Sequence, residues 1–364
     1  MPKWSDFGNI WSTLRELDVN AIREEAERPF MIACVGHERA LDEIDRLLHS
    51  GFQRYPTSGA NPLELIPLAQ AAQRAASLSN AAMLLIAVDA RTTLSHAEAE
   101  AFGRLSELTI PFLVVLIYGD RLPSSEFTLP AAISARTVAI TNPNALDAAD
   151  QLAAALLGRL PSELHLATAR RLPGLRAAYA RDLIASTAFT NATYALASGL
   201  PEQIPIISVP FAAADIVILT KNQALLVYRL ALAYGAPPDF QARIREVLPV
   251  IGGAFLWRQA ARSLIGLIPI WGLLPKVAIA YGGTYTTGVA AWRWYESGEL
   301  VSTEQLKRIS QEAMAIGRAR AAELISRARG ARAHASASGN GLLGRLKTLV
   351  LRRGKGRQLG PPSE

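Results

Sequence analysis

The chain has 364 residues, half of them hydrophobic and 19% charged, which excludes an intrinsically disordered protein and leaves room for two domains with their own cores. The single cysteine, Cys34, excludes a disulfide framework and a cysteine-based zinc cluster and fits a reducing cytoplasm. The net charge of +7 belongs to the C-terminal end: from Val301 onward, 13 Lys or Arg accompany 4 Asp or Glu, a net of +9, so the preceding residues together carry −2.

Residues 1–28 are predicted to form an amphipathic helix. The apolar side chains recur at three- and four-residue spacing and form one stripe: Trp4, Phe7, Trp11, Leu14 and Leu17. We expect this stripe to pack against the following domain, and contact with a membrane or a partner is the alternative. The segment lacks the continuous apolar run of a secretory signal.

Residues 29–162 are predicted to form an α/β domain. Apolar runs typical of buried strands cover Phe30–Val35, Met83–Val88 and Phe112–Tyr118, with weaker candidates at Thr137–Ile140 and Leu63–Ile66. Helical patterns lie between them, at Ala40–His49, Leu68–Leu78, Ser95–Leu108 and Ala145–Leu160. This alternation predicts a mostly parallel sheet covered by helices on both faces. Ligands of such folds bind at the carboxyl ends of strands, so Gly36, Asp89 and Gly119-Asp120 should lie near one edge.

The segment after the first strand departs from a phosphate-binding loop. The pattern G-x-x-x-x-G-K-[ST] would begin at Gly36, but its second glycine, lysine and Ser/Thr positions contain Leu41, Asp42 and Glu43. A phosphate loop works because backbone N–H groups converge on the phosphate while a lysine neutralises it. At about 4 Å, each carboxylate beside a triphosphate would cost on the order of a few kcal/mol at an effective dielectric constant near 20. We therefore expect no GTP hydrolysis.

Residues 28–160 resemble the Ras-like and Era-like GTPases in the order of their elements. The segments AAMLLIAVDA, IPFLVVLIYGD and ARTVAITNPNALDAADQLAAALL follow the second half of that family. The resemblance implies that Asp120 occupies the base-reading position of N-K-x-D and that Gly36 is a remnant of the phosphate loop. Ile117-Tyr118-Gly119 replaces the rest of that motif, Thr141-Asn142-Pro143 replaces S-A-K, and no D-x-x-G lies between residues 51 and 79. Asp120 is therefore more simply interpreted as a turn residue, and GTP is disfavoured as a cofactor.

No other catalytic or metal-binding constellation is expected. The five histidines, at positions 37, 49, 96, 165 and 334, are scattered without metal-ligand spacing. Cys34 is interpreted as a small core residue rather than a reactive thiol. His37, Glu38 and Arg39 are expected to project from a loop, as solvated residues or as contacts to a partner.

Residues 163–199 are predicted to be a helical connector, and residues 200–333 a hydrophobic helical domain that ends in a charged helix over Thr303–Arg329. The segments IPIISVPFAAADIVILTKNQALLVYRLALAYG and IGGAFLWRQAARSLIGLIPIWGLLPKVAIAYGGTYTTGVAAWRWYESG resemble a bacterial hydrophobic domain of unknown function, number 697, that follows some GTPase domains. This resemblance implies a GTPase-linked role at a membrane and supplies no activity.

The stretch Ser263–Trp292 has one charged residue, Lys276, and is long enough to span a bilayer. Small residues repeat every four positions in it, as at helix interfaces in lipid. Trp271, Trp292 and Trp294 are candidate interfacial anchors. Prolines and a glycine interrupt the stretch, so a tightly packed bundle or a helix within one leaflet is the alternative.

The C-terminal residues 334–364 consist of a small-residue linker, His334–Gly341, and a basic amphipathic segment, Leu342–Arg353. Its cationic face consists of Arg345, Lys347, Arg352 and Arg353. Attraction to anionic lipid is worth about 1 kcal/mol per basic residue near the surface. No aromatic interleaving indicates nucleic-acid binding, so lipid or a membrane protein is the expected partner.

These observations favour a pseudo-GTPase scaffold or regulator, not an enzyme, at the cytoplasmic face of the cell membrane. Two alternatives remain from the sequence. One is a weak nucleotide-binding switch with residual turnover. The other is a soluble interaction module that meets a protein partner or a second copy of itself.

Overall fold

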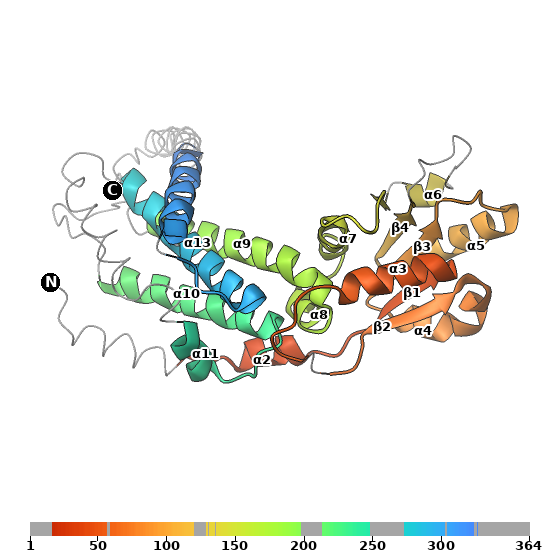
Figure 1. Ribbon diagram of the computed structural model, residues 1–364, viewed down its shortest axis with the longest axis horizontal. Coiled ribbons are helices and arrows are strands. Elements are labelled where there is room, and N and C mark those ends of the chain that lie inside the picture. The colour runs from red at the N-terminus through yellow and green to blue at the C-terminus, as the bar shows by residue number, and fades with distance from the viewer. Residues whose placement is uncertain are drawn as a thin grey trace, which may run out of the picture.

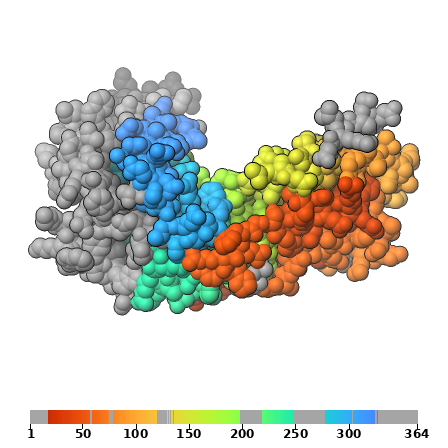
Figure 2. Space-filling view, in the orientation of Figure 1, coloured from red at the N-terminus to blue at the C-terminus, as the bar shows by residue number. Residues whose placement is uncertain are grey.

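The computed structural model describes an elongated molecule with an α/β portion at one end and a helical portion at the other (Figure 1). The described residues are 17–56, 59–119, 129, 131–134, 136–197, 213–247, 273–302, 304–323 and 326. In the space-filling view, the orange-red surface of the first third of the chain lies directly against the blue and green surface of the helical portion (Figure 2).

The α/β portion contains a five-stranded, all-parallel sheet, which confirms the predicted α/β fold. The strands are β1 (Ile32–Gly36), β2 (Leu63–Pro67), β3 (Met83–Asp89), β4 (Phe112–Ile117) and β5 (Thr137–Ile140), in the order β2-β1-β3-β4-β5. Both weaker strand candidates are therefore strands. The order reverses between β1 and β3, and in doubly wound sheets this switch point opens the crevice where ligands bind.

Helices cover both faces of this sheet. They are α3 (Glu38–His49), the 3-10 helix η1 (Leu68–Arg74), α4 (Ala75–Asn80), α5 (His96–Ser106), α6 (Ala131–Ser134) and α7 (Ala148–Leu157). Because successive strand residues point to opposite faces, Cys34 packs with α3 and α7, whereas Val35 packs towards α4 and α5. The helix predicted from residue 68 begins as a 3-10 turn.

The helical portion consists of long helices joined by short ones. Its elements are α2 (Asn20–Glu27), η2 (Ser162–Leu164), α8 (His165–Arg171), η3 (Pro173–Leu175), α9 (Arg176–Ala197), α10 (Ala213–Ala233), α11 (Phe240–Val247) and α13 (Leu273–Ser297), and residues 304–323 are also helical. One cluster of buried apolar side chains runs from the sheet through α8 and α9 into α10 and α13. The two portions therefore share a core.

The segment predicted as a connector is the joint between these portions. Arg170 of α8 is buried and donates hydrogen bonds to the carbonyl oxygens of Leu232 and Ala236, at 2.8 and 3.0 Å, where α10 ends. Its Nε also lies 3.1 Å from the carboxylate of Glu27 in α2. Since the last carbonyls of a helix lack partners within the helix, this one side chain both caps α10 and fixes α2 beside it.

Two further arginines act in the same way. Arg171 donates to two carbonyl oxygens at the end of α2, each at 3.0 Å. Arg176, which is 2% exposed, donates to the carbonyl oxygens of Ala169 and Arg170 at the end of α8. Three cationic side chains, those of Arg170 and Arg176 buried and that of Arg171 half-buried, thus bind the ends of α10, α2 and α8 within the helical portion.

The small residues of α13 pack against neighbouring helices of the same chain. A Cβ atom at Gly288 would lie 2.7 Å from Ile184 of α9 and 3.1 Å from Leu226 of α10. A Cβ atom at Gly282 would lie 2.7 Å from the sulfur of Met314, in the helix over residues 304–323. Close approach of helices through small residues, expected from the repeat, is therefore realised inside the protein.

Candidate functional site

The candidate site predicted from the sequence lies at the carboxyl edge of the sheet, where β1 leads into α3. β1 ends at Gly36, and α3 begins at Glu38, so His37 alone separates strand from helix. The expectation that residues 37–39 project from a loop is wrong, because they form the N-cap and first turn of α3. Leu41 is 3% exposed and belongs to the core, whereas Asp42 is exposed on the helix. No stretch of free backbone is left here to surround a phosphate.

Gly36 has a packing reason to be glycine. A Cβ atom at this position would lie 1.8 Å from the carbonyl oxygen of Ala87 on β3. The next residue, His37, donates its backbone N–H to that same oxygen at 3.0 Å. The glycine thus allows the ends of β1 and β3 to lie close to each other. Its interpretation as a remnant of a phosphate loop stays a prediction.

The imidazole of His37 occupies the switch point between β1 and β3. Its Nδ1 accepts a hydrogen bond from the backbone N–H of Asp89 at 2.9 Å. Because Nδ1 is the acceptor, the proton of the neutral ring is on Nε2, which lies 3.3 Å from Oε1 of Glu98. The edge of the ring also packs against Phe102, with centroids 5.4 Å apart. Both ring nitrogens are therefore engaged within the protein.

Glu98 is held in place by the start of its own helix. Ser95 caps α5 and forms a capping box with Glu98, in which the hydroxyl and backbone N–H of Ser95 donate to the carboxylate at 2.7 and 2.8 Å. These hydrogen bonds, with a smaller contribution from His37, lower the pKa of Glu98 below its usual value. The partner of His37 is thus a preoriented carboxylate.

The carboxylate at the end of β3 is paired with an arginine two residues later. Arg91 donates to both carboxylate oxygens of Asp89, its Nε at 2.6 Å, and its backbone N–H donates at 3.1 Å. Burial alone would raise the pKa of Asp89, but these hydrogen bonds and the charge of Arg91 outweigh it and lower the pKa. The Arg91 side chain crosses Gly119, where a Cβ atom would lie 2.9 Å from its Cδ.

The edge of the sheet is thus closed by paired polar groups. His37 bridges β3 and α5, and Arg91 neutralises Asp89 in front of β4. Among the described residues, no group of His, Cys, Asp and Glu is arranged to hold a metal ion. Burial raises the pKa of the Cys34 thiol, and the charge of Asp45 raises it further, so a reactive thiolate is disfavoured.

Two tryptophans predicted as membrane or partner contacts donate hydrogen bonds inside the protein. Trp292 donates its Nε1–H to the hydroxyl of Tyr234 at 2.6 Å. Trp294 donates to Oε1 of Glu246 at 3.0 Å, and the guanidinium of Arg54 lies 4.2 Å from its ring centre. Both indoles are half-buried. Their proposed contact with a membrane stays a prediction.

For the other residues predicted to contact a membrane or partner, and for Asp120, the structure describes no side-chain contacts. Lys276 lies within α13, but its side chain is not described. Six predicted residues lie outside the described part of the chain: Asp120, Trp271, Arg345, Lys347, Arg352 and Arg353.

An ion cluster that the sequence did not indicate joins the segment after α3 to the helical portion. Glu246, whose side chain is 18% exposed, accepts hydrogen bonds from Tyr55 and Trp294, each at 3.0 Å. These two bonds use Oε1 of Glu246, and the guanidinium of Arg54 lies 3.6 Å from the same oxygen. Oε2 of Glu246 lies 2.7 Å from the guanidinium of Arg243. Burial, then the hydrogen bond to Glu246, raises the pKa of Tyr55. Apart from Arg243, which is three residues away, the partners are distant in sequence, so no local pattern indicated the cluster.

A buried polar layer also crosses the helical portion. Thr284 of α13 accepts hydrogen bonds from Asn191 of α9 at 2.8 Å and from Gln223 of α10 at 3.2 Å. Its own hydroxyl donates to the carbonyl oxygen of Ala280 at 2.8 Å. Asn222 donates to Asn191 at 2.6 Å. The polar run that includes Asn222 and Gln223, inside a long apolar segment, was the signal available in the sequence.

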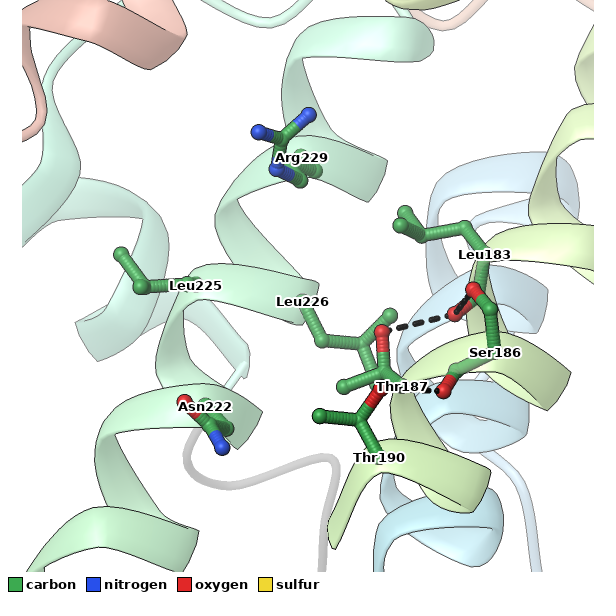
Figure 3. Close-up of a pocket in the computed structure, with 8 residues that line it drawn as sticks. All are labelled: Leu183, Ser186, Thr187, Thr190, Asn222, Leu225, Leu226 and Arg229. Atoms are coloured by element: carbon green, nitrogen blue, oxygen red, sulfur yellow. Dashed lines mark hydrogen bonds between the residues drawn. The ribbon is translucent and has the colours of Figure 1, made fainter. Parts of the chain in front are cut away.

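A groove lies beside this layer, between α9 and α10 (Figure 3). It encloses about 210 Å³ and combines leucines with hydroxyl, amide and guanidinium groups. Its lining residues are Leu183, Ser186, Thr187, Thr190, Asn222, Leu225, Leu226 and Arg229. Arg229 is paired with Glu25 of α2 at 2.7 Å.

Comparison with known proteins adds no relative. No protein-family model matches the chain, and no curated protein matches it. In the described parts of the chain, no helix has both the length and the apolar character that crossing a membrane requires. Of the stretch predicted as a candidate span, only the part from Leu273 onward is described.

Proposed function

We propose that this chain is a pseudo-GTPase scaffold or regulator that does not hydrolyse GTP. The single observation that carries this proposal is the β1–α3 junction, where one residue, His37, stands in place of a phosphate loop. Its imidazole is bound by Asp89 on one side and Glu98 on the other.

Electrostatics at the same edge support the absence of triphosphate binding. Binding phosphate at the start of α3 would require displacing His37, whose ring contacts the carboxylate of Glu98 and the backbone N–H of Asp89. The lowered pKa values of Glu98 and Asp89 keep both carboxylates ionised at neutral pH. The charge of Glu98 disfavours a ligand of the same sign, and Arg91 is already paired with Asp89 and so cannot neutralise a phosphate.

The joint between the two portions supports a scaffold over a switch. A switch needs an element with two arrangements that a ligand can bias. Here the sheet and the long helices share one apolar core, and Tyr55 and Arg54, which follow α3, contact Glu246 of α11. Moving one portion relative to the other would break up this core and leave the carboxylate of Glu246, whose side chain is 18% exposed, without these two partners, which is costly.

The proposed location is the cytoplasmic face of the cell membrane. Its support is the C-terminal charge of +9 from Val301 onward and the amphipathic segment Leu342–Arg353. Lipid headgroups or a membrane protein are the proposed partners. A weak nucleotide switch and a soluble interaction module are the competing functions, and the two experiments below separate them.

The nucleotide experiment is a titration of the purified protein with a fluorescent GTP analogue, with and without magnesium. We expect no saturable binding up to high micromolar concentration. A His37→Gly variant serves as the matched control, because it removes the imidazole that fills the site. Magnesium-dependent micromolar binding by the unaltered protein would overturn the proposal in favour of the switch.

The membrane experiment is flotation with anionic vesicles and with zwitterionic vesicles at low salt. We expect flotation only with the anionic vesicles and its loss in a variant with Arg345, Lys347, Arg352 and Arg353 changed to Gln. Protein that stays in the soluble fraction with both vesicle types would reject membrane association and favour the interaction module.

A further inference from the structure

The two outer strands of the sheet, β2 and β5, differ in what they offer to a further strand. On the β2 side, the carbonyl oxygen of Pro62 accepts the N–H of Ile32 at 2.8 Å, so the backbone at positions 63, 65 and 67 faces away from the sheet. Leu63 gives its N–H to the side chain of Asn61 at 3.0 Å, and Pro67 has no N–H to give. This edge is thus largely blocked to a further strand.

At the opposite edge, the backbone of β5 is open. The carbonyl oxygens of Arg136 and Ile140 accept hydrogen bonds from β4 and the residue after it, at 2.8 and 3.0 Å. Because alternate residues of a strand face alternate sides, Thr137 and Ala139 direct their backbone N–H and C=O groups away from the sheet. The guanidinium of Arg136 lies 4.5 Å from the ring centre of Phe112 on β4, so its charge is turned back towards the sheet. In the described part of the chain, no proline and no side-chain acceptor blocks either outward N–H.

The open positions of β5 are self-complementary. A second β5, placed antiparallel about a two-fold axis at Val138, pairs Thr137 with Ala139 of the second copy and Ala139 with Thr137 of the second copy. Each of these pairs exchanges two backbone hydrogen bonds. The same register places Arg136 opposite Ile140 of the second copy, so no like charges face each other across the strands.

The helix that follows β5 fits the same two-fold arrangement. α7 packs on both β4 and β5. Neighbouring strands lie about 4.8 Å apart, so the axes of the two α7 helices would lie on the order of 10 Å apart, close to the spacing of packed helices. The outer surface of α7 includes the small residues Ala154, Ala155 and Gly158, which are at least partly exposed and permit this separation.

The charges at the two ends of α7 are complementary in this arrangement. Asp147 precedes α7 and Arg159 follows it, and both are exposed. Asp147 accepts a hydrogen bond from Gln151 at 2.7 Å, and among the described residues neither charge belongs to an ion pair. Antiparallel packing brings Asp147 of each copy to the end of the helix where Arg159 of the other copy lies. Leu146, which is fully exposed at the same end, would gain an apolar cover. This complementarity favours a second copy over an unrelated strand.

We propose that two copies of this chain associate through β5, so that their sheets join into one continuous sheet with the two α7 helices side by side. The interface consists of the outward backbone of Thr137 and Ala139 and the charged ends of α7. The proposal is independent of nucleotide and membrane binding, because it uses neither the β1–α3 junction nor the C-terminal segment.

The first test measures the association of the full chain by sedimentation velocity, at protein concentrations from about 1 to 200 µM. We expect a reversible monomer–dimer equilibrium in the unaltered protein. Ala139→Pro removes one outward N–H from each copy and should weaken the dimer about tenfold or more, the effect of two lost hydrogen bonds. Ala139→Val keeps the N–H and, as the matched control, should leave the equilibrium unchanged. Ala139→Pro should melt like this control, because the missing N–H points away from the sheet.

The second test reverses the charges at the ends of α7. Asp147→Arg and Arg159→Asp should each weaken the dimer, because each places like charges opposite each other across the axis. In an equimolar mixture of the two variants both pairs are attractive again, so a heterodimer should form with the affinity of the unaltered dimer. A role of these residues within one molecule gives no such recovery. A monomer at every concentration, a dimer that Ala139→Pro leaves unchanged, or a mixture that stays monomeric would overturn the proposal.

Discussion

Replacing Gly36 with alanine tests whether packing or a lost nucleotide site explains this glycine. The new methyl group would lie 1.8 Å from the carbonyl oxygen of Ala87 and 2.7 Å from its carbonyl carbon. Both atoms belong to the backbone of β3, so no side-chain rotation relieves the contact. The strands must separate, which also stretches the hydrogen bond from His37 to the same oxygen. We expect a destabilisation of about 3 kcal/mol, at the upper end of the usual overpacking range.

The assay is urea and thermal unfolding followed by circular dichroism. Gly103→Ala is the matched control, because Gly103 lies in α5 and a methyl group there meets no atom within 4 Å. In a helix interior this control should stabilise the protein by up to about 1 kcal/mol. For a chain of 364 residues the Gly36→Ala loss should lower the melting temperature by roughly 4 °C. A Gly36→Ala protein as stable as the unaltered one would refute the packing argument.

Three further predictions concern Thr284, Asp89 and Cys34. Thr284→Val removes the acceptor of two buried amides and should cost about 1–3 kcal/mol in urea unfolding, whereas Thr286→Val removes only a hydroxyl bonded to its own helix and should cost less. The pKa of Asp89 is lowered in the folded state from its ordinary value of 3.8. The stability that its ionised carboxylate adds is therefore fully present above pH 3.8 and is lost as the pH falls through the lower folded pKa. The melting temperature of Asp89→Asn should accordingly fall less between pH 5 and pH 2 than that of the unaltered protein. Burial raises the pKa of Cys34, so a thiol reagent should modify it only at the rate of unfolding.

Each of these predictions has a clear contrary outcome. Equal losses for Thr284→Val and Thr286→Val would show that the polar layer contributes nothing. Parallel melting curves against pH for Asp89→Asn and the unaltered protein would show that the pairing of Asp89 with Arg91 does not contribute to stability. Rapid labelling of Cys34 under native conditions, compared with labelling in urea, would contradict its burial.

The sequence predicted the strands well because parallel strands buried on both faces are continuous apolar runs. Residues 83–88 and 112–118 fit this pattern and correspond to β3 and β4. The helix starts were less accurate. Residues 37–39 were expected in a loop because the comparison with a phosphate loop assumed one, whereas β1 passes directly into α3.

The candidate site was located from the sequence, but its partners were not. Gly36 and Asp89 were placed at one edge because the ends of parallel strands meet there. That His37 binds Asp89 and Glu98 was not predicted, since these residues lie 52 and 61 positions away. Hydrogen bonds at such separations depend on the sheet register and on how α5 packs, and no local pattern reports either.

By itself, the sequence determined the α/β class, the absence of a phosphate-binding motif after the first strand and the concentration of positive charge at the C-terminal end. These are properties of residue type and spacing, and they need no knowledge of neighbours in space. Only the tertiary structure decided that the predicted connector is a joint of capping arginines and that the small residues of α13 meet helices of the same chain. The physical reason is that an apolar run or a small-residue repeat specifies a surface to be buried, while the partner that buries it is chosen by packing across the whole chain.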